Sequence, residues 1–274
     1  MNVAILHPGL MGETLAANCS AQTWWVSAGR SHDTRSRAEA HGMTELASLD
    51  ELTSGVDIVV SICPPAAAET LAEQVAASGF AGLYVDANAI SPATARSIAT
   101  KFEHYVDGSV IGPPAHQAGT TRLYLSGDRA HEVADLYVDS ALDARVIDGD
   151  AGAASALKMA YASWTKIGSA LNLAIRALAS AEGVDEALVD EWNLSQPGLV
   201  ERSDRVAVGV SPKAWRFTGE MQQIADAFSA AGLPADFAHG AHEIYDRMAD
   251  FKGTTGTTLA EVMVALGAIE SPDD

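Results

Sequence analysis

The N-terminal segment constrains the fold more than any other part of the chain, because it combines a strand, a glycine turn and the start of a helix. Residues 3–6 (VAIL) are apolar, residues 7–12 (HPGLMG) contain two glycines, and a helical pattern follows through residue 17. This order is typical of a dinucleotide-binding βα unit, in which the turn backbone approaches a pyrophosphate. We therefore expect residues 1–148 to form an α/β domain of Rossmann type around a mostly parallel sheet.

The glycine turn provides the first candidate cofactor contacts. Gly9 is expected to lie against the pyrophosphate and Gly12 to allow close packing of helix on strand, whereas His7 stands where the GxGxxG pattern has its first glycine. An ordinary βα turn with two glycines is the alternative interpretation. The predicted contacts in this turn are Pro8, Gly9, Leu10, Met11 and Gly12.

The end of the second predicted strand favours NADP over NAD as the cofactor. Residues 23–27 (TWWVS) form this strand, and Arg30 and Ser31 follow where an NAD site usually carries an acid for the ribose 2′-hydroxyl. The planar guanidinium of Arg30 suits a 2′-phosphate instead. Arg35 and Arg37 lie close behind, with a solvated basic helix start as an equal alternative. The predicted 2′-phosphate contacts are Arg30, Ser31 and Arg35.

Two further predicted strands end at the same edge of the sheet. Residues 56–62 are an apolar run that stops at two prolines, and residues 83–86 are followed by a loop that contains Asn88. In open α/β sheets ligands bind outside the carboxyl ends of the strands. Ordinary helix-start chemistry explains the prolines equally well. The predicted cofactor-lining residues here are Cys63, Pro64, Pro65 and Asn88.

After residue 148 the strand patterns stop, and residues 149–274 are predicted to form an all-helical substrate and dimerisation domain. Residues 149–183 have small and apolar residues at three- and four-residue spacing, which predicts one long buried interdomain helix. Lys158 lies inside this run, with Tyr161 and Thr165 on the same face. Many such lysines only extend along apolar surface. Ligand sites favour domain junctions, however, so we assign Lys158 to a site.

Charge and composition exclude several function classes. The 274-residue chain has 36 acidic and 17 basic residues and a formal net charge of −19, so its field opposes nucleic acids and anionic membranes. It has no run of eighteen apolar residues and begins without a basic leader, so a cytoplasmic location is expected. Cys19 and Cys63 lack metal-ligand spacing and fit a reducing compartment, so no metal site is predicted.

Taken together, these motifs resemble the β-hydroxyacid dehydrogenase and 6-phosphogluconate dehydrogenase-like superfamily over nearly the whole chain. The matching segments are the glycine turn, residues 86–92 (DANAISP), residues 107–127 and the glycine-rich entry to Lys158. The resemblance implies a nicotinamide-dependent oxidoreductase that acts on CH–OH or C=O groups of a small molecule. It implies further that Lys158 is the general acid or base. Tyr161, near the position where the family commonly has an asparagine, is expected to share the proton relay or to orient the substrate.

Departures from the family pattern concern the substrate. The segment Ile111-Gly112-Pro113 stands where the family has Ser-Gly-Gly, which removes a hydroxyl and a backbone donor, and Asn88-Ala89 replaces a Ser-Thr pair. Thr165 replaces the glutamate that phosphogluconate dehydrogenases carry seven residues after the lysine. These changes argue against oxidative decarboxylation of a sugar phosphate and against a simple small hydroxyacid bound in the family's usual way. The predicted substrate contacts are Gly112, Pro113 and Thr165.

Three functions remain open from the sequence. The first is hydride transfer between NADPH and a small carbonyl or hydroxy compound. The second is imine reduction, and the third is a catalytically silent NADP-binding sensor or scaffold. A homodimer through the C-terminal helices is expected, because the apolar helix needs more cover than the remaining helices offer and the resembled family dimerises through this domain.

Overall fold

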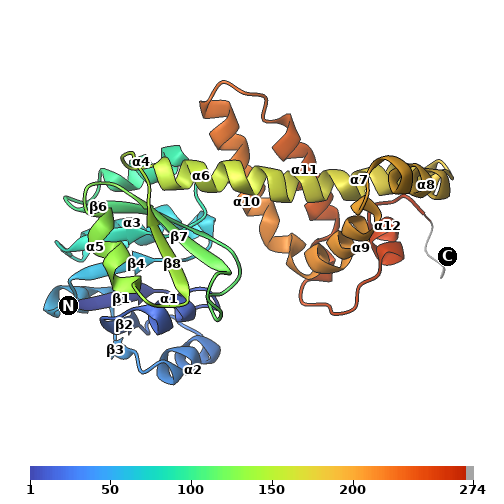
Figure 1. The fold of residues 1–274 in the computed structure, drawn as a ribbon. Helices are drawn as coiled ribbons and strands as arrows, with labels where there is room; N and C mark the ends of the chain where they lie inside the picture. The colour runs from blue at the N-terminus through green and yellow to red at the C-terminus, as the bar shows by residue number, and fades with distance from the viewer. Residues whose placement is uncertain (270–274) are drawn as a thin grey trace. The chain divides into compact units, whose positions relative to one another are not determined.

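The computed structural model describes residues 1–269 and divides the chain into two compact units, Met1–Met159 and Ala160–Asp274 (Figure 1). The boundary between the units falls within the helix α6 (Ala153–Ala162), whereas the composition of the sequence changes after residue 148. The difference arises because the first turns of α6 are hydrogen-bonded to the sheet of the first unit, as described below.

The first unit is built on one 8-stranded sheet with the strand order β3-β2-β1-β4-β5-β6-β7-β8. Neighbouring strands are parallel except for the antiparallel pair β6 and β7. The order from β3 to β6 is that of a Rossmann domain, so the predicted fold class is confirmed. The strands are β1 (Asn2–Leu6), β2 (Gln22–Val26), β3 (Thr44–Leu46), β4 (Ile58–Ser61), β5 (Leu83–Asp86), β6 (Tyr105–Ile111), β7 (Thr121–Ser126) and β8 (Leu142–Val146).

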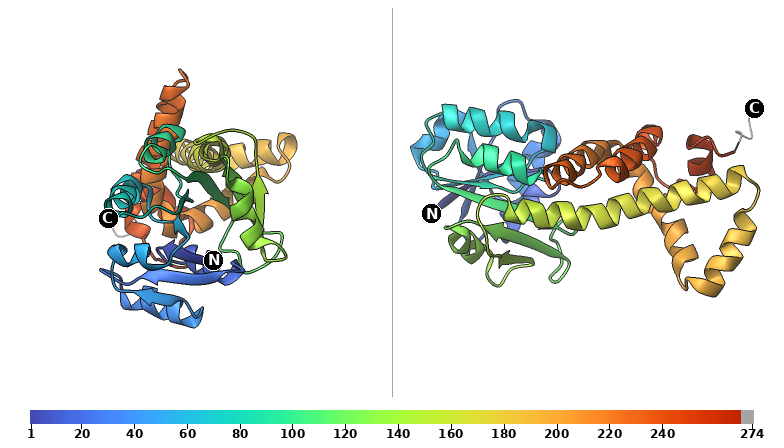
Figure 2. Two further views of the ribbon diagram at one scale, coloured as in Figure 1. Left: turned by 90° about the vertical axis from the view of Figure 1, so that its left-hand side faces the viewer. Right: turned by 90° about the horizontal axis from the view of Figure 1, so that it is seen from above.

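Helices cover both faces of this sheet (Figure 2). Successive residues of a strand point to opposite faces, so Val3 and Ile5 pack against one helical layer while Ala4 and Leu6 pack against the other. One layer contains α1 (Gly12–Asn18), α2 (His32–Ala40) and α5 (Ala130–Ala134) with the 3-10 turn η3 (Asp135–Tyr137). The other contains α3 (Ala68–Ala77), α4 (Pro92–Ala99) and the 3-10 turn η1 (Leu49–Ser54).

The second unit is helical throughout its described part, as predicted. Its helices are α7 (Gly168–Ala181), α8 (Asp185–Ser195), α9 (Leu199–Val210), α10 (Ala214–Ala230), α11 (Asp236–Arg247) and α12 (Leu259–Ala265). Short 3-10 turns, η5 (Ser211–Lys213) and η6 (Ala249–Phe251), connect several of them. Within residues 1–269 no helix combines the length and apolar character needed to cross a bilayer.

The long predicted helix is present, but it differs from the prediction in two ways. A π-helical turn, η4 (Ser163–Ile167), separates α6 from α7 without ending the helix. The helix is also not buried on every side, because Trp164, Leu171 and Leu178 are 70%, 58% and 65% exposed. The prediction of a buried helix is therefore wrong for these three side chains.

Polar contacts hold the second unit together around α7 and η4. Arg176 is buried, and its guanidinium binds both carboxylate oxygens of Asp185 at 2.7 and 2.9 Å, which ties α7 to the start of α8. Lys166 forms an ion pair with Glu220, and the Lys166 carbonyl accepts the hydroxyl of Tyr245 at 2.6 Å. These bonds fix the π-helical turn against α10 and α11.

Candidate functional site

The glycine turn joins β1 to α1 with no space for a side chain at its last residue. A Cβ at Gly12 would lie 2.4 Å from the carbonyl oxygen of His7 and 3.1 Å from the Cγ2 of Ile62, so only glycine fits there. At Gly9, by contrast, an added Cβ would have nothing within 4 Å. The turn therefore packs tightly at Gly12 and has open space beside Gly9.

Substitution of the two glycines separates these roles. Gly12→Ala is expected to lower the free energy of unfolding by about 2 kcal/mol or more, because the new methyl group collides with backbone that has no room to move. Gly9→Ala is the matched control, and its stability should stay within about 0.5 kcal/mol of the parent. Urea unfolding followed by circular dichroism measures both. Equal stability of the two variants would contradict the packing role of Gly12.

The donors of this turn fit the pyrophosphate of a dinucleotide. Among residues 1–269, the backbone N–H groups of Leu10 and Met11 have no acceptor, and Leu10 is 64% exposed. Available N–H groups beside open backbone are the arrangement that binds phosphate oxygens at βα turns. The carboxylate of Glu13 lies next to this turn, but Arg37 is 3.8 Å away and balances its charge.

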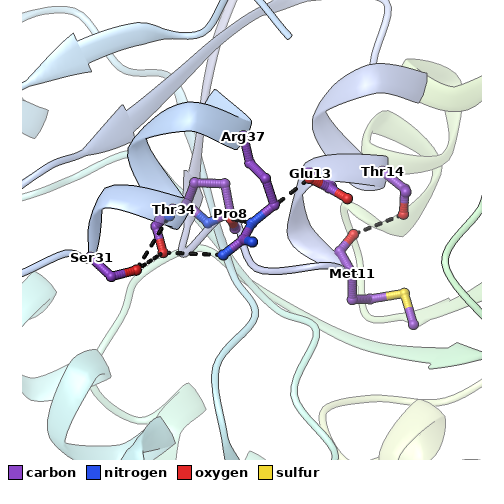
Figure 3. Close-up of polar contacts among 7 residues, drawn as sticks. All are labelled: Pro8, Met11, Glu13, Thr14, Ser31, Thr34 and Arg37. Atoms are coloured by element: carbon purple, nitrogen blue, oxygen red, sulfur yellow. Dashed lines mark hydrogen bonds and ion pairs between the residues drawn. The ribbon is translucent and has the colours of Figure 1, made fainter. Parts of the chain in front are cut away.

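The three arginines after β2 have different partners. Arg35 binds both carboxylate oxygens of Glu45, at 2.5 and 2.9 Å, and its guanidinium stacks over Trp25. Arg37 instead turns toward the glycine turn, where its Nε donates to the carbonyl of Pro8 at 3.1 Å (Figure 3). Residues two apart on a helix face different directions, which is why two arginines so close in sequence separate in this way.

Arg37 is therefore a residue of this site that the predicted contacts omit, and Arg35 has a structural partner. Arg37 also donates to the hydroxyl of Thr34 at 3.4 Å, and Thr34 is in contact with Ser31 at 3.1 Å (Figure 3). The hydroxyl of Ser31 caps α2 by accepting the N–H of Thr34. The helical period of residues 31–37 could have revealed this face from sequence, because Ser31, Thr34 and Arg37 recur every three residues.

Arg30 is exposed at the end of β2, and its charge acts on the glycine turn. Burial, and secondarily the positive charge of Arg30, lower the pKa of His7 to about 4, so His7 is neutral at neutral pH. The Nε of Arg30 donates to the carbonyl of Ala28 at 3.2 Å. The end of β2 thus places a cation near the turn that is predicted to bind the cofactor.

Asn88 shapes the loop after β4 from within the protein. Its side-chain oxygen accepts the N–H of Cys63 at 2.5 Å, its side-chain nitrogen donates to Ser61 at 3.0 Å, and it is 2% exposed. Pro64 is exposed, and Pro65 begins the 3-10 turn η2 (Pro65–Ala67). Burial and the neighbouring Asp86 raise the pKa of Cys63 to about 12, so this residue stays a thiol. Asn88 therefore acts on the conformation of the loop.

A buried row of polar residues crosses the sheet beneath the start of α6. Ser61, Asp86, Asp107 and Ser126 are register partners on adjacent strands, and all are fully buried. Burial raises the pKa of Asp86 to about 7. The neighbouring Asp107 contributes to this rise in pKa, because two carboxylates so close together disfavour each other's ionisation.

Two members of this row, Asp107 and Ser126, accept hydrogen bonds from the first turn of α6 and so cap this helix. Asp107 accepts the N–H groups of Gly152 and Ser155 at 3.0 and 2.9 Å and the hydroxyl of Ser155 at 2.7 Å. The hydroxyl of Ser126 accepts the N–H of Ala154 at 3.2 Å. These bonds satisfy donors that the first turn of a helix otherwise leaves free. Sequence reasoning missed this cap, whose one local signal is a strand-embedded aspartate in residues 105–111.

Strand β6 also holds Lys158. The Nζ of Lys158 donates to the carbonyl of Val110 at 2.8 Å, so one strand anchors α6 through Asp107 and again one turn later through Lys158. Val110 lies two residues before Gly112, and both Gly112 and Pro113 are exposed. The structure thus brings Lys158 close to the start of the segment predicted to bind substrate.

Tyr161 and Thr165 belong to the second unit. Tyr161 lies on α6 and is 47% exposed, whereas the hydroxyl of Thr165 donates to the carbonyls of Tyr161 and Ala162 at 3.3 Å each. A helical threonine bonded to the preceding turn has its proton engaged by its own helix. The roles of Tyr161 in the proton relay and of Thr165 toward a substrate stay predictions.

A family model and one curated relative match parts of the chain. Residues 179–248 match the family described as "Domain of unknown function (DUF1932)". The relative is an uncharacterized 28.5 kDa protein in the 7S RNA 5′ region of Methanothermus fervidus, which is 29% identical over 164 residues. That alignment covers 59% of this chain and 63% of the relative's length, so the chain spans less than two thirds of the relative.

Solved structures match nearly the whole chain. A conserved protein of unknown function, described as structurally similar to 3-hydroxyacid dehydrogenases, is 26% identical with a TM-score of 0.71, over 92% of this chain and 98% of that one. The 3-hydroxyisobutyrate dehydrogenase of Mycobacterium tuberculosis, solved with L-serine, is 21% identical with a TM-score of 0.72, over 97% and 98%. An imine reductase from Myxococcus stipitatus, solved with NADP+, is 18% identical with a TM-score of 0.55, over 97% and 100%.

The last two likenesses concern the fold alone, because their identities to this chain are 21% and 18%. The first agrees with them at a higher identity of 26%. The predicted resemblance is therefore confirmed at the level of the fold: the chain has the two-domain fold of the 3-hydroxyacid dehydrogenases, with a Rossmann domain followed by a helical domain.

Proposed function

We propose that the protein is an NADP-dependent oxidoreductase that transfers a hydride between the nicotinamide and a small carbonyl or hydroxy compound. The observation that carries this proposal is the position of Lys158, whose ammonium is hydrogen-bonded to the Val110 carbonyl at 2.8 Å beside the exposed residues Gly112 and Pro113. The same unit presents the glycine turn with its available N–H donors. A phosphate-binding turn and a held proton donor are the parts that such a reaction requires.

In the proposed mechanism the nicotinamide, when bound, supplies or accepts the hydride. In the direction of reduction Lys158 donates a proton to the oxygen of the carbonyl as charge develops on it. In the direction of oxidation the neutral amine takes the proton of the hydroxyl group. The carbonyl of Val110 orients the Lys158 nitrogen, and the Asp107 cap fixes the helix that carries it.

NADP is the proposed cofactor because the end of β2 carries Arg30 and no acid. Arg30→Ala is expected to raise the Kd of NADPH about tenfold and to leave the Kd of NADH within about twofold, since a 2′-phosphate contact is charge-assisted. Arg145→Ala is the matched control, because Arg145 lies on β8 and pairs with Asp143 at the surface. Fluorescence titration measures the six Kd values, for the parent and the two variants with each cofactor. Equal losses for NADPH and NADH in Arg30→Ala would argue against the assigned contact.

Turnover assays test the reaction itself and its two rivals. Purified protein with NADPH is assayed against a panel of aldehydes, keto acids and cyclic imines. Oxidation of NADPH by aldehydes or keto acids supports the proposal. Turnover of cyclic imines alone supports an imine reductase, and NADPH binding without turnover of any member supports a sensor or scaffold.

A homodimer through the second unit is part of this proposal. Leu171 and Leu178 lie seven residues apart on α7 and so share one helix face, and both are exposed in the single chain, as is Trp164 in the π-helical turn that precedes them. An exposed apolar stripe of this length is typical of a protein interface.

Leu171→Arg is therefore expected to give a monomer, because it places a charge at the centre of the stripe. Val138→Arg, at another exposed apolar position and in the first unit, should remain a dimer. Light scattering coupled to gel filtration distinguishes the two masses. A monomeric parent protein would refute the dimer.

A further inference from the structure

One hydroxyl joins the glycine turn to the loop between β6 and β7. Thr14, in the first turn of α1, is 1% exposed, and its Oγ1 donates to the carbonyl of Met11 at 2.8 Å (Figure 3). The same oxygen accepts the N–H of Ala115 at 3.1 Å. Met11 belongs to the predicted cofactor turn, and Ala115 lies in the loop that begins with Gly112 and Pro113.

A second side chain of α1 completes the attachment of this loop. The side-chain nitrogen of Asn18 donates to the carbonyl of Ala115 at 3.0 Å, and its side-chain oxygen accepts the N–H of Ala141 at 2.8 Å. Both backbone polar groups of Ala115 are thus bound by α1, and Ala115 itself is 2% exposed. The loop is buried at this one point, while its neighbours on both sides, residues 112–113 and 116–119, are exposed.

The two hydrogen bonds of the Thr14 hydroxyl, to Met11 and to Ala115, depend on each other's direction. A hydroxyl has one proton and two lone pairs, so the direction in which Thr14 donates to Met11 limits how it accepts from Ala115. Hydrogen bonds arranged in series also polarise and strengthen one another. A ligand that orders Met11 therefore favours one orientation of the Thr14 hydroxyl and, with it, one position of Ala115.

We propose that Thr14 couples the two loops, so that a dinucleotide bound at the glycine turn orders residues 112–120 for the second substrate. This inference rests on the proposed function, because it takes the glycine turn as the cofactor site. Coupling between two sites is reciprocal, so a substrate held by residues 112–120 tightens the binding of the dinucleotide by the same factor. The consequence is that each ligand binds more tightly when the other is already bound.

Hydrogen–deuterium exchange of the full-length protein, with and without saturating NADPH, tests this coupling. In the parent protein NADPH is expected to slow exchange in residues 112–120 about fivefold, the effect of one hydrogen bond's free energy on local opening. Thr14→Val keeps the shape of the side chain but removes the hydroxyl. It should bind NADPH within about threefold of the parent, yet lose this protection.

Two controls separate coupling from a general loss of structure. Thr14→Ser keeps the hydroxyl and should restore the response of residues 112–120. The loop at residues 63–67, which has no bond to Thr14, should respond to NADPH equally in all three proteins. If Thr14→Val does not fold, Asn18→Asp serves instead, because it keeps the acceptor for Ala141 and removes the donor to Ala115, and it should weaken the response.

Each outcome decides between the two proposals. Protection of residues 112–120 that is as strong in Thr14→Val as in the parent would overturn the coupling and leave the proposed function standing. NADPH binding to the parent without any change in this loop would do the same. Failure of the parent to bind NADPH would overturn the proposed function and this inference together.

Discussion

Replacement of Lys158 by methionine is expected to lower turnover about a thousandfold, the usual contribution of a general acid or base. Methionine preserves the length and apolar stem of the side chain but carries no proton. It also leaves the carbonyl of Val110 without its 2.8 Å donor. The Kd of NADPH should change by less than about threefold, because the predicted cofactor contacts lie elsewhere, at the glycine turn and at the ends of β2 and β4.

Replacement of Lys158 by arginine distinguishes the loss of proton transfer from the loss of positive charge. Lys158→Arg keeps a cation and a donor for Val110, but a guanidinium does not give up its proton in proteins, so turnover should remain about as low as in Lys158→Met. Lys101→Met is the matched control, because Lys101 is ion-paired with Glu73 in the first unit, away from the glycine turn. Single-turnover oxidation of NADPH measures each rate. Turnover of Lys158→Met within tenfold of the parent would remove Lys158 from the mechanism.

The second large effect is expected at Asp107. Asp107→Asn should lower the free energy of unfolding by about 2 kcal/mol, because the N–H groups of Gly152 and Ser155 lose a charged acceptor and an amide nitrogen stands where an oxygen accepted the Ser155 hydroxyl. Turnover should fall as well, since the displaced first turn of α6 leads directly into the turn that carries Lys158. Ser155→Ala removes one 2.7 Å bond and should cost about 1 kcal/mol.

Chemical unfolding measures the stability of these variants, and steady-state kinetics measures their turnover. Asp143→Asn is the control, because Asp143 pairs with Arg145 at the surface and should change stability by less than about 1 kcal/mol. At a temperature where Asp107→Asn is fully folded, its KM for NADPH should equal that of the parent while its kcat is reduced. A reduced stability with unchanged kcat would show that Asp107 supports the fold but does not position Lys158.

The parts of the fold that the sequence predicts are those set by local chemistry. The strand, turn and helix at residues 3–17 follow from apolar runs and from two glycines, and a Cβ has no room at the second of them. The apolar run of residues 56–62 and the helical period after residue 148 likewise depend on near neighbours. Such features therefore place the glycine turn and Lys158 without knowledge of the packing.

The remaining features of the site join residues that are far apart in sequence. Asp107 and Ser155 are separated by 48 positions, and Thr14 and Ala115 by 101, so no local pattern connects them. The pairing of Arg35 depends on Glu45, which β3 brings beside α2 only after the sheet has formed. The π-helical turn at Ser163–Ile167 has no local signal, because its residues suit an ordinary helix equally well.

The proposed proton donor and the residues that anchor it belong to one unit. Lys158, its acceptor on Val110 and the Asp107 cap all precede Ala160, where the second unit begins. The segment that matches the domain of unknown function, residues 179–248, therefore contains no part of the anchor that holds Lys158. Substitutions within that segment are expected to leave the hydrogen bonds of this anchor intact.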